Sequence, residues 1–259
     1  GYNGCLIGCA TAVFISPLTS VDLSLPLVQT AAASGLVTTI VGGTIAPFIS
    51  AALKPAMGNV PQWTLTFNLV TLGILLRTKP FLNNSSTEHT SLPSMVNIDP
   101  MVALNAPLKG ISQIWVVESS LSGLALLGGI YLYSPGLAGH AFLGSSIGAL
   151  SGAAMIGSDF GDIEIGLYGF NSCLTALGVG VFFVHSPRAV LLSTGGAAVT
   201  AGLFGALKII FGDVLMVPCL TLPFCVSMTG CYLLGYAQIP GLRLAANPHS
   251  PEKNIAPPL

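Results

Sequence analysis

Long apolar runs follow one another along the chain and are separated by short polar stretches. Eight such runs cover residues 3–16, 26–53, 61–77, 122–134, 138–157, 166–184, 188–211 and 217–236. A helix needs about 20 apolar residues to cross the hydrocarbon core of a bilayer, and these runs lack the period-two alternation of barrel strands. The pattern therefore predicts an all-α polytopic membrane protein, with the shorter runs tilted, broken or covered by neighbouring helices.

Two polar stretches interrupt this pattern and predict how the chain is divided. In order, the parts are a first half at 1–83, a linker at 84–104, a second half at 105–237 and a tail at 238–259. Overlapping Asn-x-Ser sequons at Asn83 and Asn84 suit an extracellular loop and are candidate glycosylation sites; an unmodified sequon is an equally open interpretation. Arg243 and Lys253 indicate a cytoplasmic tail under the positive-inside rule.

The composition excludes several classes of protein. Charged residues make up 7% of the 259 residues, with eight Lys and Arg against nine Asp and Glu, and the mean hydropathy is +0.81. A soluble domain usually carries about a quarter charged residues, and a nucleic-acid-binding protein needs a basic face. The six cysteines lie in apolar runs and are expected to be free and buried. His140 and His185 stand alone, so we expect no metal site and no cofactor.

Two motifs occur twice, in the same order. Gly1–Leu6 matches Gly169–Leu174 at four of six positions, and Val60–Phe67 matches Val217–Phe224 at five of eight. The second copy contains five spans, and an odd number of crossings reverses the copy that follows in the membrane. The pattern therefore predicts two inverted repeats, with a substrate path at the interface between them. The first copy has only the last three spans, so we expect a front segment equivalent to 106–158 to be missing from it.

The segment 106–123 is amphipathic and too polar to span a membrane. A re-entrant helix fits, because polar groups at membrane depth are tolerated where they line a cavity or pack against protein. Gln113 is then a candidate pore donor or acceptor, and Glu118 a residue near a mouth of the pore. A helix lying on the membrane surface is the alternative.

The repeated motifs, together with Pro107-Leu-Lys-Gly-Ile-Ser-Gln113, resemble the urea transporter family over nearly the whole chain outside the linker and tail. The resemblance implies two inverted halves of five spans, each with a re-entrant pore helix, and a homotrimer in the plasma membrane with one pore per protomer. It also implies passive movement of urea down its gradient. The positions carried over are Gln113 and Ile114 beside one urea site, Phe170 and Leu174 on the wall facing them, Tyr2 and Leu6 on the wall of the opposite site, and Thr64 and Thr221 at a central constriction.

The chain departs from the family pattern at several positions. Val116 stands where a Phe is common, Ser119 and Ser120 replace Asn-Pro, and Thr66 replaces the Pro that the second copy keeps at Pro223. Three alternatives stay open: a permease for ammonia or another small neutral or amide solute, a truncated chain that does not conduct, and an intramembrane hydrolase. The last lacks a recognisable nucleophile and base at membrane depth.

The chemistry of urea fits the residues carried over. Urea is flat, neutral and very polar, so stripping its hydrogen bonds in an apolar medium costs several kcal/mol. Apolar faces would hold its plane, and oxygens along one edge would accept its N–H groups. Outside this path, Asp159, Asp162 and Glu164 are expected in a solvated loop, and Lys208 and Asp213 are expected to pair with each other or to reach the membrane surface.

Overall fold

The structure is a computed structural model that describes residues 1–15, 26–82, 100–155 and 160–255. The described residues are helical and contain no β-strand, with one isolated bridge between Phe183 and Leu244. The predicted all-α class is therefore confirmed. Asn83, Asn84 and Asp159 lie outside the described residues, as does most of the predicted linker.

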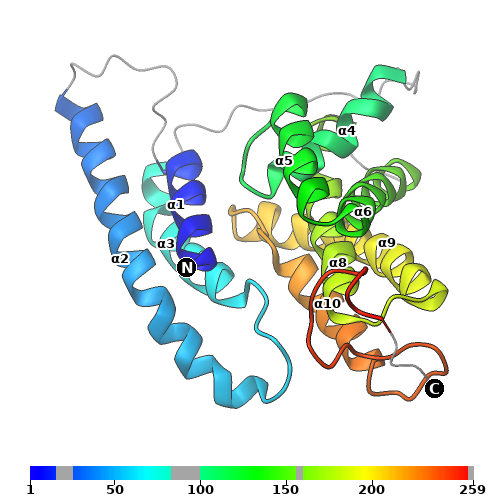
Figure 1. The fold of residues 1–259 in the computed structure, drawn as a ribbon. Helices are drawn as coiled ribbons and strands as arrows, with labels where there is room; N and C mark the ends of the chain where they lie inside the picture. The colour runs from blue at the N-terminus through cyan, green and yellow to red at the C-terminus, as the bar shows by residue number, and fades with distance from the viewer. Residues whose placement is uncertain (16–25, 83–99, 156–159, 256–259) are drawn as a thin grey trace. The chain divides into compact units, whose positions relative to one another are not determined.

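Each predicted apolar run overlaps one helix (Figure 1). The helices are α1 (Tyr2–Phe14), α2 (Pro26–Met57), α3 (Leu65–Leu82), α4 (Pro100–Gln113), α5 (Ser120–Tyr133), α6 (Pro135–Ala154), α7 (Phe160–Glu164), α8 (Leu167–Phe182), α9 (Pro187–Ile209) and α10 (Leu222–Leu234), with a π-helical turn at Ile210–Val214 between the last two. The runs predicted at 61–77 and 217–236 begin too early. Residues 61–64 and 217–221 are not helical, because each stretch carries a proline and a residue with positive φ.

The chain divides into two compact units. The first comprises Gly1–His89 and Ile210–Leu222, and the second comprises Thr90–Ile209 and Pro223–Leu259. The segment Ile210–Leu222 belongs to the second half by sequence, yet its contacts are with the first unit. This segment carries Thr221, so both threonines of the repeated motif lie in one unit.

The first unit is built from α1, α2 and α3, each of which packs against the other two (Figure 1). Ile7 of α1 and Leu75 of α3 are fully buried in the core of this unit. Gly42 of α2 allows a close approach, since a Cβ there would lie 3.0 Å from the side chains of Ile7 and Ile74. At a rise of about 1.5 Å per residue, the 32 residues of α2 extend over about 48 Å.

The second unit is centred on α6, α8 and α9, which pack against one another. Small residues bring α6 onto α8: a Cβ at Gly144 would lie 2.4 Å from the Cβ of Ala176, and one at Gly148 would lie 2.4 Å from the carbonyl oxygen of Tyr168. Buried hydroxyls join α8 to α9, where the Oγ1 atoms of Thr175 and Thr200 are 2.8 Å apart. Close helix approach through small residues and interhelical hydroxyl bonds is typical of membrane proteins.

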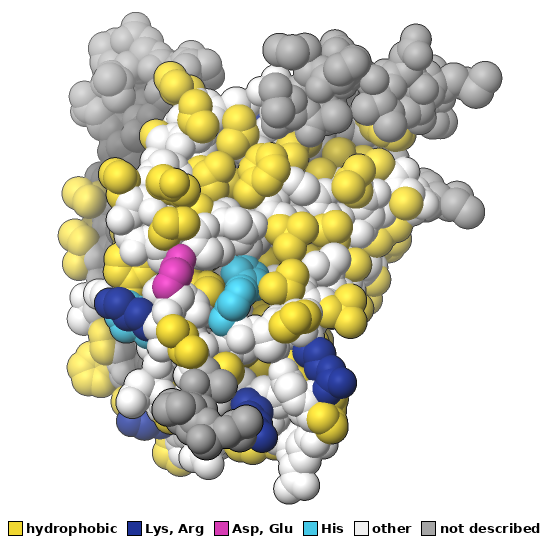
Figure 2. Space-filling model, turned by 45° about the vertical axis from the view of Figure 1, so that its right-hand side comes forward, with side chains coloured by type: hydrophobic (Ala, Val, Ile, Leu, Met, Phe, Trp, Pro, Cys, Tyr) yellow, Lys and Arg dark blue, Asp and Glu magenta, His cyan; other side chains and the backbone are white. Residues whose placement is uncertain are grey.

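The surface is unusually apolar for a soluble protein. Hydrophobic side chains spread over much of the face shown in Figure 2, and Leu132 is 88% exposed. Among the described residues, Gly35–Met57 and Pro187–Val214 are long and apolar enough to cross a membrane by length and composition. A large exposed apolar surface of this kind marks a contact with lipid or protein.

The described part of the C-terminal segment packs onto the second unit. The amide of Asn254 donates to the carbonyl oxygen of Val181 at 2.7 Å. Glu252 accepts hydrogen bonds from the Ser134 hydroxyl at 2.7 Å and from the Gly136 N–H at 2.6 Å, at the N-terminus of α6. These bonds to its charged form, with that of Ser134 the largest contribution, lower the pKa of Glu252 to about 2.

Candidate functional site

Two turns of the same kind precede α3 in the first unit and α10 in the chain. Trp63 has φ 49° and Leu220 has φ 52°, and each stands directly before a threonine of the repeated motif. The N–H of Leu65 donates to the carbonyl of Gln62 at 2.9 Å, and the N–H of Leu222 donates to that of Cys219 at 3.2 Å. Positive φ is uncommon for bulky residues and is found in strained segments at functional sites.

The first unit brings Thr64 and Thr221 into direct contact. Their Oγ1 atoms lie 2.7 Å apart, and the two residues are 2% and 6% exposed. Thr64 begins α3, since its carbonyl accepts the backbone N–H of Asn68 at 3.0 Å. Two hydroxyl groups, 157 residues apart in the sequence, therefore meet in the buried interior of this unit.

Asn68 completes this cluster and was not predicted from the sequence. Its Nδ2 donates to the Thr64 carbonyl at 3.0 Å and to Thr221 Oγ1 at 2.9 Å, and its Oδ1 accepts the Thr221 N–H at 3.0 Å. The available signal was a polar residue inside the apolar run 65–76, one helical turn after Thr64. We call Thr64, Asn68 and Thr221 the threonine cluster.

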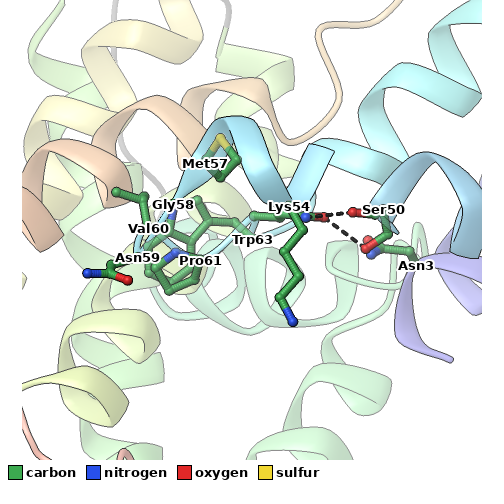
Figure 3. A pocket seen from close by; sticks show the side chains of 10 residues that line it. Asn3, Ser50, Lys54, Met57, Gly58, Asn59, Val60, Pro61 and Trp63 are labelled. Carbon is green, nitrogen blue, oxygen red and sulfur yellow. Dashed lines mark hydrogen bonds between the residues drawn. The ribbon is translucent and has the colours of Figure 1, made fainter. Parts of the chain in front are cut away.

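A cavity of about 350 Å³ lies beside the cluster in the first unit (Figure 3). Its lining includes Asn3 of α1, Ser50 and Lys54 of α2, and the segment 57–63 that leads to Thr64. Ser50 and Gln62 join its walls by two hydrogen bonds of 2.8 and 2.7 Å. Asn3 Oδ1 is buried without a hydrogen-bond partner, so this rim of the cavity holds an unused acceptor.

Gln113 and Ile114 lie at the end of α4 in the second unit. The Gln113 Nε2 donates to the carbonyl oxygen of Ile165 at 3.0 Å, and Ile114 packs against a buried cluster that includes Ile111. Glycines let α4 approach here, since a Cβ at Gly166 would lie 2.4 Å from the Gly110 nitrogen. The helix predicted over 106–123 is too long. In the structure α4 ends at Gln113, and an irregular stretch follows it.

The four predicted wall residues differ in their surroundings. Phe170 is buried in the second unit, with its ring edge-on to Phe204 at 6.2 Å between centroids, and Leu174 is half-buried one turn later on α8. In the first unit Leu6 is buried and Tyr2 is exposed. Phe170 and Gln113 are linked through neighbouring backbone groups. The Phe170 N–H donates to the carbonyl of Gly166, and the Gln113 side chain donates to the carbonyl of Ile165.

Several predictions for charged and thiol groups need correction. Lys208 forms an ion pair with Asp162, not with Asp213, which is exposed. Asp162 and Glu164 lie in the short helix α7 rather than in a loop, because the turn of helix presents Asp162 to Lys208. The six cysteines are free; four are buried as expected, whereas Cys5 is exposed and Cys9 is half-buried.

Glu118 and His140 both have polar partners. Glu118 is exposed and pairs with Lys109 at 3.2 Å. His140 is buried, with Nδ1 2.9 Å from the Ser193 hydroxyl. Among residues 1–15, 26–82, 100–155 and 160–255, no three His, Cys, Asp or Glu side chains are grouped as metal ligands would be.

The described residues form an all-helical protein with a large exposed apolar surface and a buried polar cluster. A sequence model of the urea transporter family matches residues 1–236. The chain therefore belongs to the urea transporter family, as its motifs predicted.

Mammalian relatives agree with this assignment. The chain is 30% identical to urea transporter 1 of Ovis aries over 190 residues, which cover 70% of this chain and 49% of the relative. It is 26% identical to urea transporter 1 of Mus musculus over 243 residues, which cover 88% of this chain and 58% of the relative. The chain thus spans about half the length of the curated relatives it matches.

Proposed function

We propose that this protein moves urea passively across a membrane, through a narrow path with the threonine cluster at its constriction. The observation that carries the proposal is the contact of Thr64 with Thr221 at 2.7 Å, in a chain of the urea transporter family. Hydroxyl oxygens in an apolar environment replace part of the hydration that urea loses. The path needs no ion or nucleotide, because the solute is neutral and moves down its own gradient.

The remaining site residues are proposed as walls and acceptors for urea. Phe170 and Leu174 form an apolar wall one turn long, and the Gln113 Oε1 accepts an N–H of urea beside them. The hydrogen bond from Gln113 to Ile165 supports this role, because it fixes the amide in one orientation. Tyr2 and Leu6 form the corresponding wall in the first unit, next to the cavity that Asn3 lines.

The larger arrangement is also part of the proposal. Two inverted repeats are supported by the matching turns at Trp63 and Leu220, which give both threonines the same place at the start of a helix. A homotrimer in the plasma membrane, with the tail on the cytoplasmic side and glycosylation at Asn83 or Asn84, follows from the family resemblance and the sequons.

The experiment is stopped-flow light scattering on proteoliposomes that contain the purified chain. An inward urea gradient is expected to give a faster swelling phase than in protein-free liposomes, with a rate that saturates at high urea and does not change with membrane potential. Mannitol serves as the impermeant control. A urea rate equal to that of protein-free liposomes, with the protein folded, contradicts the proposal.

A further inference from the structure

Asn68 is a fully buried amide of α3, with 0% of its surface exposed. Burying an amide is unfavourable unless its donors and acceptor are satisfied. Asn68 meets this requirement with groups of Thr64 and Thr221, so the reason for its presence lies in the threonine cluster.

The backbone fixes which way the amide faces. The Thr221 N–H requires an acceptor and lies 3.0 Å from Oδ1, while the Thr64 carbonyl requires a donor and lies 3.0 Å from Nδ2. Turning the amide over would place donor against donor and acceptor against acceptor. The orientation of Asn68 therefore follows from two groups that cannot change their polarity.

This orientation determines how the Thr221 hydroxyl is used. Nδ2 donates to Thr221 Oγ1 at 2.9 Å and occupies one of its two lone pairs. The hydroxyl hydrogen has two acceptors: Thr64 Oγ1 at 2.7 Å, and Asn68 Oδ1 at 3.2 Å, which already accepts the Thr221 N–H. When the hydroxyl donates toward Thr64, the shorter of the two contacts, the second lone pair of Thr221 is left as an acceptor.

We propose that Asn68 is a positioning residue, which holds Thr221 against Thr64 and keeps one Thr221 lone pair ready to accept an N–H of the solute. This inference rests on the proposed function for its consequence in transport. The two motif copies differ here, since the position that matches Asn68 in the second copy is Cys225. A thiol is a weak hydrogen-bond donor, so the second copy has no amide equivalent to that of Asn68.

The first test replaces the amide by a carboxyl group, with Asn68→Asp. When protonated, the carboxyl can still donate one hydrogen bond; when ionised, it only accepts and faces the Thr64 carbonyl. The charged side chains that the structure describes in this unit are Lys54, Arg77 and Asp213, all exposed. The carboxyl ionises as the pH rises, so urea permeability is measured from acid to alkaline pH.

Urea permeability of the Asn68→Asp variant is expected to stay within about twofold of wild type at the acid end and to fall roughly five- to tenfold on ionisation. Wild type is expected to show no such step over the same range. Thr71→Val is the matched control, because Thr71 is buried one turn further along α3 and its hydroxyl has no hydrogen-bond partner. A pH-independent flux at the wild-type level in Asn68→Asp overturns the proposal.

A second measurement tests the positioning role of Asn68 without using urea flux. If the wild-type protein carries no urea, the proposed function fails, but this measurement still decides the inference. Thermal unfolding in detergent is compared for Asn68→Leu, Thr221→Val and the double variant. If Asn68 acts through Thr221, the double variant loses less melting temperature than the two single variants together. Additive losses overturn the positioning role whatever the flux result.

Discussion

Removing the Thr221 hydroxyl is the sharpest single change at the proposed constriction. Thr221→Val keeps the shape of the side chain and deletes one oxygen, which lies 2.7 Å from Thr64 Oγ1 and 2.9 Å from Asn68 Nδ2. The Thr221 N–H keeps its bond to Asn68 Oδ1, so the segment stays attached to α3.

The expected loss follows from the hydrogen bonds that the oxygen makes. One acceptor for urea contributes a net 0.5–1.5 kcal/mol, so the barrier rises by about 1 kcal/mol and permeability falls roughly fivefold. The protein also loses the bonds to Thr64 and Asn68, which costs about 1–2 kcal/mol and lowers the melting temperature by about 3–8 °C.

Stopped-flow urea flux in proteoliposomes measures the first effect, and thermal unfolding in detergent measures the second. Thr71→Val removes a buried hydroxyl from the same unit and is expected to leave urea flux unchanged. Urea flux at the wild-type rate in Thr221→Val would refute the role of Thr221 in the path. A full loss of folded protein would show that the cluster is chiefly structural.

Two further predictions concern packing and the C-terminal segment. Gly148→Ala places a Cβ 2.4 Å from the Tyr168 carbonyl oxygen and should destabilise the protein by about 1–3 kcal/mol, whereas Gly139→Ala on the same helix meets open space and should not; melting temperatures compare them. The pKa of Glu252 is lowered from 4.5 to about 2, so its stabilising effect is present above pH 4.5 and is lost as the pH falls toward 2. Glu252→Gln should therefore lower the melting temperature slightly at neutral pH. Between neutral and acid pH, the melting temperature of this variant should fall less than that of the wild-type protein. The same fall in both proteins would show that Glu252 does not stabilise this contact with Ser134.

The sequence was sufficient to predict the helical fold and the family, but not the residues at which the helices begin and end. Each predicted apolar run overlaps a helix of the described residues, because burial and lipid contact both demand continuous apolar surface. Hydropathy started the helices at 61–77 and 217–236 too early. Trp63 and Leu220 have positive φ, a conformation that a sequence usually signals with glycine, and neither residue is glycine. The amphipathic helix was extended past Gln113 for a similar reason: Val116, with φ 60°, lies in the irregular stretch that follows.

Contacts between distant residues were the harder part. The family resemblance singled out Thr64 and Thr221, which stand at the same place in both copies of the repeated motif. Asn68 was missed because its partner Thr221 is 153 residues away and no repeated pattern links them. Lys208 was expected to pair with its near neighbour Asp213 or to reach the membrane surface, whereas tertiary packing pairs it with Asp162, 46 residues away.

The most direct test of the central claim closes the proposed path between Thr64 and Thr221. The two Oγ1 atoms are 2.7 Å apart, so sulfur atoms in their place are within reach of a disulfide bond. In a Thr64→Cys, Thr221→Cys protein, oxidation is expected to abolish urea flux in proteoliposomes and dithiothreitol to restore it, with neither single variant responding. Undiminished urea flux through the oxidised, cross-linked protein would contradict the account.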